Sequence, residues 1–127
     1  MPGETNKKRI LHVDDEEDTL TVVKKVLEDE GYEVVSLKRG KAALAAVKSA
    51  SFDLLILDIM LPDMSGWELF SSLGKMKPGY RVMFLSILDI TEEKLKELLN
   101  EGIVDYIKKP FDNDDLVKRV KKALATK

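Results

Sequence analysis

Residues 54–66 read LLILDIMLPDMSG, and this stretch gives the strongest indication of the architecture. Four consecutive apolar residues at 54–57 are typical of a parallel strand covered on both faces, because a strand with one exposed face would alternate with polar residues. The run ends on Asp58, and Pro62 and Gly66 then mark a turn. A buried parallel strand that ends on a carboxylate predicts an α/β sheet with a polar site at its edge.

The rest of the chain supplies the partners that such a strand needs. With the central run taken as 52–57, strand patterns also occur at 9–13, 81–86, 33–37 and 104–108, and the last two are mixed enough in polarity to be edge strands. Apolar stripes of helical spacing separate these segments, as at Leu20, Val23 and Leu27. The alternation of strand and helix, five times over, predicts a doubly wound α/β fold.

Several residues predict where the helices begin and end. Ser65 with Glu68, and Asp89 with Glu92, have the spacing of a capping box, and Asp112 stands where a last helix would start. Gly31 and Gly102 are placed to end helices.

Size and composition exclude several classes of protein. We expect one domain over residues 1–127, with residues 1–7 as a flexible tail. The 21 basic residues nearly balance 23 acidic ones, which gives no general attraction to nucleic acid, and the absence of cysteine excludes disulfides and thiolate chemistry. No apolar run approaches the roughly 18 residues of a spanning helix, so we expect no membrane insertion and a cytoplasmic protein.

Acidic side chains follow two of the predicted strands. Asp14 and Asp15 come directly after residues 9–13, and Asp58 ends the central strand, so all three should meet at one edge of the sheet. Two like charges about 4 Å apart repel by about 4 kcal/mol at an effective dielectric of about 20. An all-oxygen cluster of this kind favours a hard divalent cation, and Mg²⁺ above others if phosphate is the substrate.

Each of these residues also has an ordinary structural interpretation. Asp14 and Asp15 could cap the helix that follows, and Asp58 could belong to a strand-end turn. Lys109, before Pro110, would bring a cation to the same edge, but spacing alone does not distinguish it from a solvated lysine such as Lys108.

Four motifs in order relate the chain to a known family. ILHVDDEED at 10–18, LLILDIMLPDMSG at 54–66, FLS at 84–86 and DYIKKPF at 105–111 together resemble the receiver domains of two-component response regulators, including single-domain chemotaxis receivers. The resemblance extends from about residue 8 to about residue 124. It implies a flavodoxin-like (βα)5 fold, with a five-stranded parallel sheet in the order 2-1-3-4-5 and helices on both faces.

The resemblance also implies a role for the acidic cluster. Asp58 would take a phosphoryl group from a sensor histidine kinase or a phosphotransfer protein. Asp15, Asp58 and the backbone carbonyl of Met60 would hold Mg²⁺, for which Mn²⁺ could substitute, and Asp14 would help chiefly through water.

Other residues would convert phosphorylation into a change of shape. By the same resemblance, Lys109 and Ser86 would contact the phosphoryl oxygens, and Tyr106 would swing inward. These movements would reshape the face formed by the fourth helix, fifth strand and fifth helix, where an undetermined protein or a second copy in a weak dimer would bind. For Tyr106 the alternative is simple packing on an edge strand.

The implied function is that of a phosphorylation-controlled binding module, a signalling switch rather than an enzyme with a separate substrate. No DNA-binding domain follows in the chain, and the basic residues of the last helix are interpreted as a solvated face. The alternative function is a phospho-independent pseudo-receiver that acts as an interaction scaffold. An aspartyl phosphohydrolase would need an acid at position 60, where Met60 stands, and a flavodoxin would need a phosphate loop in place of VDDEED.

Some positions depart from the family pattern or receive no chemical role. Ile87 and Leu88 follow Ser86 and form a bulkier lip than the usual small residue, and apolar Met60 and Leu88 predict slow hydrolysis of the phosphoryl group. His12 is interpreted as a strand residue whose ring is satisfied by a neighbour. Trp67 and Phe70 are interpreted as packing residues, with an exposed tryptophan that anchors a partner as the alternative.

Overall fold

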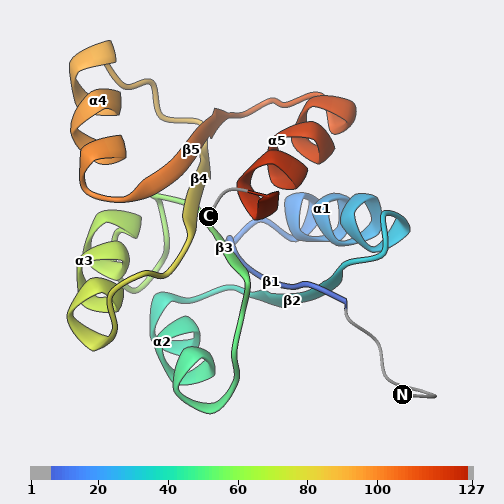
Figure 1. Ribbon diagram of the computed structural model, residues 1–127, viewed down its shortest axis with the longest axis horizontal. Coiled ribbons are helices and arrows are strands. Elements are labelled where there is room, and N and C mark those ends of the chain that lie inside the picture. The colour runs from blue at the N-terminus through green and yellow to red at the C-terminus, as the bar shows by residue number, and fades with distance from the viewer. Residues whose placement is uncertain (1–6, 126–127) are drawn as a thin grey trace.

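The computed structural model describes residues 7–125, in which five strands alternate with five helices (Figure 1). In chain order the elements are β1 (Arg9–Val13), α1 (Glu17–Asp29), β2 (Glu33–Leu37), α2 (Gly40–Ser49), β3 (Leu54–Leu57), α3 (Gly66–Met76), β4 (Val82–Ser86), α4 (Glu92–Asn100), β5 (Ile103–Lys108) and α5 (Asn113–Ala125). The predicted strands are therefore confirmed to within one or two residues. Apart from Lys7, the predicted tail lies outside the described residues.

The five strands form one parallel sheet in the order β2-β1-β3-β4-β5, as the resemblance implied. All four residues of β3 are buried, and the strand pairs with β1 on one side and β4 on the other. The two strands of mixed polarity, β2 and β5, lie at the edges of the sheet. The continuous apolar run of β3 thus has the physical cause that was expected, because neither of its faces meets water.

Helices cover both faces of the sheet (Figure 1). Alternate residues of β1 point to opposite layers: Ile10 belongs to the core that the sheet forms with α1 and α5, whereas Leu11 belongs to the core formed with α2, α3 and α4. Each layer has its own apolar core, and the aromatic ring of Phe84 is the largest fully buried side chain. The sheet edge where all five strands end is left for loops.

Most of the predicted helix ends are confirmed. Ser65 accepts from the backbone N–H of Glu68, whose side chain accepts from the backbone N–H of Ser65, so the capping box is present. The side chain of Asp112 accepts a bond from a backbone N–H in the first turn of α5. Gly31 and Gly102 follow α1 and α4 with φ of 93° and 110°, a conformation that glycine adopts without strain.

The predicted start of the fourth helix was wrong. Thr91, not Asp89, caps α4, and its hydroxyl accepts from the backbone N–H of Lys94 at 3.0 Å. Asp89 instead forms an ion pair of 2.7 Å with Lys108 on β5. A threonine two residues closer to the helix satisfies the same backbone donors, which leaves the aspartate for a cross-element contact.

No helix in the part of the chain that the structure describes is long and apolar enough to cross a membrane.

Candidate functional site

The carboxyl ends of four adjacent strands, β1, β3, β4 and β5, bring the predicted polar residues together. Asp14 follows β1, Asp58 follows β3, Ser86 ends β4 and Lys109 follows β5. Because these strands are parallel and adjacent, the residues meet at one edge of the sheet. All four are buried, which is unusual for charged side chains and calls for mutual partners.

Lys109 is the centre of this acidic pocket. Its ammonium group lies 2.7 Å from Oδ2 of Asp14, 2.9 Å from Oε1 of Glu16 and 3.2 Å from Oδ2 of Asp58. The exposed fractions are 0% for Asp14, 4% for Asp58 and 8% for Lys109, so the first and third of these contacts lie almost out of water. The interpretation of Lys109 as a solvated surface lysine is therefore wrong.

Burial and the ion pairs have opposite effects on the pKa values of Asp14 and Lys109. Burial raises the pKa of Asp14 to about 6, although the hydrogen bond from Lys109 works against this rise. Burial alone would lower the pKa of Lys109, but its bonds to Asp14 and Glu16 prevail, and the pKa lies above its usual value. The hydrogen bond from Lys109 lowers the pKa of Glu16. The ammonium group of Lys109 thus stabilises the charged forms of Asp14, Glu16 and Asp58. A single positive charge offsets only part of the repulsion among three negative ones.

Glu16 is a member of the pocket that the sequence analysis did not single out. It stands directly after the aspartate pair in VDDEED, and no role was predicted for it. Its side chain is exposed, but Oε1 reaches Lys109. Adjacency to Asp14 and Asp15 was the only available indication, and spacing could not show which of several neighbouring acids would reach the lysine.

Three of the carboxylates could share a cation. Asp14, Asp15 and Asp58 each offer an oxygen, and these oxygens lie within 4.8 Å of one another. Mg²⁺ binds oxygen at about 2.0–2.1 Å and usually keeps several waters, so a site of this width can hold it with some contacts through water. An all-oxygen donor set with more carboxylates than ammonium groups fits a hard divalent cation.

The loop after β3 holds Asp58 in a defined orientation. The backbone N–H of Met60 donates to Oδ1 of Asp58 at 3.1 Å, while Oδ2 faces Lys109. Gly66 packs so closely behind the strand end that a Cβ atom there would lie 2.3 Å from the carbonyl oxygen of Asp58. The two carboxylate oxygens therefore have different partners, one in the loop and one in the pocket.

Ser86 and Tyr106 contact the same segment of the loop after β4. Ser86 is fully buried, and its hydroxyl accepts a 3.4 Å bond from the backbone N–H of Leu88. The Tyr106 hydroxyl donates to the backbone oxygen of Leu88, and its ring packs against Phe84 at 6.2 Å between centroids. Burial, together with the charge of Asp58, raises the pKa of Tyr106. Tyr106 therefore packs on the core and is also hydrogen-bonded to the loop after β4.

The interpretation of His12 as a residue satisfied by a neighbour was wrong. The ring is fully buried, and neither of its nitrogens has a hydrogen-bond partner among the described residues. Burial and the nearby charge of Lys109 lower its pKa to about 3, so the imidazole is neutral. Its Nε2 lies 3.8 Å from Oδ2 of Asp14.

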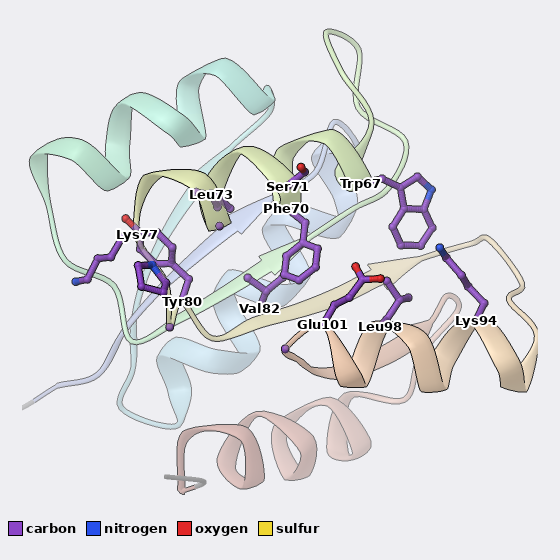
Figure 2. Close-up of a pocket in the computed structure, with 14 residues that line it drawn as sticks. Trp67, Phe70, Ser71, Leu73, Lys77, Tyr80, Val82, Lys94, Leu98 and Glu101 are labelled. Atoms are coloured by element: carbon purple, nitrogen blue, oxygen red, sulfur yellow. The ribbon is translucent and has the colours of Figure 1, made fainter.

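Another hollow lies away from the acidic pocket, between α3 and α4 (Figure 2). It is a groove of about 520 Å³, with Trp67 and Lys94 at one end and Tyr80 and Lys77 at the other. Trp67 packs against the buried Phe84 with ring centroids 5.0 Å apart, and Phe70 does so at 5.9 Å. The packing interpretation of both aromatics is confirmed, and none of the residues of the acidic pocket lines this groove.

A second hollow of about 390 Å³ adjoins the acidic pocket. Ile87, Lys109 and Phe111 line it, together with side chains from the first turns of α1. Ile87 is 59% exposed, and it adds apolar surface beside the pocket. Ile87 therefore forms the expected apolar rim after Ser86. The charged residues Asp14, Asp58 and Lys109 are all present in the acidic pocket beside it.

Comparison with known proteins gives one consistent result. The model of the response regulator receiver domain family matches residues 10–121. The transcriptional regulatory protein PcoR of Escherichia coli is 39% identical over 116 residues, which are 91% of this chain and 51% of PcoR. A CheY-like receiver domain protein from Methanospirillum hungatei is 37% identical, with a TM-score of 0.84 and 94% of each chain covered. The non-phosphorylated HemR receiver domain from Leptospira biflexa is 29% identical, with a TM-score of 0.86, and the match covers 95% of this chain and 97% of that one.

The chain spans about half the length of the curated relatives that it matches. The similarity therefore concerns the part of these relatives that corresponds to the fold described above.

Proposed function

The chain belongs to the response regulator receiver domain family, and from this premise we propose that Asp58 accepts a phosphoryl group from a phosphohistidine. The donor would be a sensor histidine kinase or a phosphotransfer protein. The observation that supports the proposal is the convergence of Asp14, Asp58 and Lys109 in a buried pocket at the ends of β1, β3 and β5. A buried carboxylate beside a fixed cation is suited to accept a phosphoryl group, because the cation can also bind the negatively charged oxygens of that group.

The proposed reaction is a single displacement at phosphorus. An oxygen of Asp58 forms a bond to phosphorus while the bond from phosphorus to the donor's imidazole nitrogen breaks, and the product is an acyl phosphate. Lys109 lies 3.2 Å from Asp58, so its ammonium group would bind a phosphoryl oxygen after only a small movement. The chain would act in this way as a signalling switch on its own aspartate.

Mg²⁺ is the cation that we propose for the three-carboxylate cluster, with Mn²⁺ as a substitute. Asp15, Asp58 and the backbone carbonyl of Met60 would hold it, and Asp14 would contact it through water. When bound, the ion would neutralise charge on the phosphoryl oxygens. The geometry that favours this proposal is a set of three carboxylate oxygens that lie within 4.8 Å of one another, without a histidine or cysteine ligand among them.

Ser86 and Tyr106 are the proposed switch residues. If the Ser86 hydroxyl turns to a phosphoryl oxygen, it gives up its bond to the backbone of Leu88, to which Tyr106 is also joined. The loop before α4 would then move, and the face made by α4, β5 and α5 would change shape. A downstream protein, or a second copy in a weak dimer, would bind that face. The location that we propose for the reaction is the cytoplasm.

The test is phosphorylation by a small donor. The chain is incubated with acetyl phosphate and Mg²⁺, and intact mass spectrometry is used to count phosphoryl adducts. We expect one adduct, which is absent from an Asp58→Asn variant and from samples treated with a chelator. Asp89→Asn is a matched control, because this exposed acid lies near the pocket but contacts Lys108 instead of Lys109.

An unmodified wild-type chain, or an adduct that persists in Asp58→Asn, would contradict the proposal. The first result would favour the phospho-independent scaffold, which no feature of residues 7–125 supports at present, since the acidic pocket is intact.

A further inference from the structure

Three buried side-chain atoms lack a hydrogen-bond partner within the described part of the chain, and all belong to two residues. They are Nδ1 and Nε2 of His12 and Oγ of Ser36. Buried polar groups without partners cost free energy, and a native protein usually contains only a few of them. Their occurrence in one place therefore needs an explanation, and the reaction proposed above makes no use of either residue.

The two residues are neighbours beside the acidic pocket. His12 on β1 pairs in register with Ser36 on β2, so their side chains leave the same face of the sheet on strands about 4.8 Å apart. Asp14 lies two residues beyond His12, and Oδ2 of Asp14 is 3.8 Å from Nε2. Ser36, His12 and Asp14 thus form a row that leads to Lys109.

The chemistry of a neutral imidazole fits this row in one arrangement. The ring has one N–H donor and one acceptor nitrogen. Nε2 faces a carboxylate oxygen, which can only accept, so the proton belongs on Nε2. Among the described residues, Nδ1 is then an acceptor without a donor, and the hydroxyl of Ser36, on the neighbouring strand in register with His12, is a donor without an acceptor.

The distances from Oδ2 of Asp14 to Lys109 and to His12 indicate when His12 could form a hydrogen bond to Asp14. Lys109 now holds Oδ2 of Asp14 at 2.7 Å, whereas the contact with His12 is too long for a hydrogen bond. In the proposed reaction Lys109 turns to a phosphoryl oxygen, and Asp14, which is 0% exposed, loses its nearest partner. A movement of less than about 1 Å would let the ring replace the ammonium group.

We propose that His12 is a positioning residue that holds Asp14 through Nε2–H when Lys109 turns to the phosphoryl group, with Ser36 fixing the ring through Nδ1. The inference rests on the proposed phosphorylation of Asp58. It assigns His12 no contact with the reacting atoms.

The first test reads the tautomer directly. Nitrogen-15 NMR of the histidine ring, which is unique in the chain, is recorded with and without Mg²⁺ and beryllofluoride, a phosphoryl analogue. We expect the Nε2–H tautomer in both states, and slower exchange of that proton in the beryllofluoride complex. A ring protonated on Nδ1, or unchanged exchange in the complex, would overturn the role of His12. Failure of the wild-type chain to bind beryllofluoride would instead refute the function on which the inference rests.

The second test uses variants of His12. His12→Leu should weaken beryllofluoride binding at fixed Mg²⁺ by roughly ten- to a hundredfold in calorimetry, as the loss of supporting contacts around metal ligands commonly does. His12→Gln, whose amide N–H stands near the place of Nε2, should recover most of the affinity, whereas His12→Asn should not. Leu11→Met, on the opposite face of β1, is the control and should bind as wild type. Equal affinity of the Leu and Gln variants would contradict the proposal, and if the Leu variant does not fold, the comparison of Gln with Asn decides.

Discussion

Gly66 packs its backbone directly against the backbone of Asp58 and Ile59. A Cβ atom there would lie 2.3 Å from the oxygen of Asp58 and 2.7 Å from the Cα of Ile59, both of them backbone atoms that cannot rotate away. Gly74, in the same helix, would place its Cβ in open space. The two glycines of α3 therefore have different physical reasons for being present.

Gly66→Ala should lower the free energy of unfolding by roughly 1–3 kcal/mol, because the strand end and α3 must separate to admit a methyl group. Urea denaturation monitored by circular dichroism measures the change. Gly74→Ala is the matched control, and it should stabilise the fold by about 0.5–1 kcal/mol through its helix propensity. Equal effects of the two substitutions would show that the close contact at Gly66 is not rigid.

Met60 and Leu88 place apolar side chains beside the acidic pocket, with exposed fractions of 55% and 38%. Neither can orient a water molecule toward phosphorus, so we expect the acyl phosphate on Asp58 to hydrolyse slowly. Met60→Gln should hasten hydrolysis, which is followed as loss of phosphoryl label from the purified protein in Mg²⁺. Met76→Gln, far along α3, is the control. A Met60→Gln rate equal to that of the wild type would indicate that Met60 only packs.

The start of α2 is capped by a residue from another part of the chain. Arg39 at its N-cap makes no side-chain hydrogen bond to the helix. Instead Asp63, from the loop between β3 and α3, accepts the backbone N–H groups of Gly40 and Lys41, both at 2.9 Å. Asp63 thereby joins the loop that follows Asp58 to the N-terminus of α2, and α2 covers the same face of the sheet as α3.

The contribution of Asp63 to stability should depend on pH. The backbone N–H of Lys41 and its neighbour lower the pKa of Asp63, so the folded state binds this proton less readily than the unfolded state. The stabilisation is present above the unfolded value of 3.8 and is lost as pH falls through the lower folded value. Asp63→Ala should reduce Tm at pH 7, and the difference from wild type should shrink toward pH 2.

Thermal unfolding followed by circular dichroism over this pH range measures the effect. Glu97→Ala, on the solvent side of α4, should leave Tm nearly unchanged at every pH. A constant difference between Asp63→Ala and wild type down to the lowest pH would show that the carboxylate charge plays no part.

Across the molecule, the acidic pocket gathers charge at one end of a fold whose net charge is only −2. Lys109 offsets part of the repulsion among Asp14, Glu16 and Asp58, while Asp15 lies close by without an ion pair to it. Repulsion among these carboxylates costs stability in the free chain, and a bound cation would offset part of that cost.

Mg²⁺ should stabilise the fold by mass action, by about 1.4 kcal/mol when its concentration is tenfold above the Kd. Thermal scans with Mg²⁺ and after addition of a chelator measure the difference. Asp15→Asn should abolish most of it. NaCl at matched ionic strength is the control for screening, and a rise in Tm as large with NaCl as with Mg²⁺ would argue against a specific site.

The elements and the main members of the site could be predicted from local patterns. The apolar run at 54–57 indicates a buried parallel strand because only a strand covered on both faces carries no polar residues. Parallel strands bring their carboxyl ends to one edge, so the positions of Asp14 and Asp58 in the sequence suffice to bring them together. The strand order and the family came from the four motifs taken jointly, and both are confirmed.

Other features depend on how far side chains reach across elements that are distant in the sequence. Lys108 and Lys109 are neighbouring lysines with the same chemistry, but Lys108, the last residue of β5, pairs with Asp89, whereas Lys109 points into the pocket and pairs with Asp14. In the same way Asp63 caps a helix 23 residues before it, Glu16 reaches the lysine, and His12 stands unpartnered beside Ser36. Periodicity specifies which residues are buried, because burial depends on the face of one element. Partner choice depends on distances between elements, and these exist only after the layers have packed.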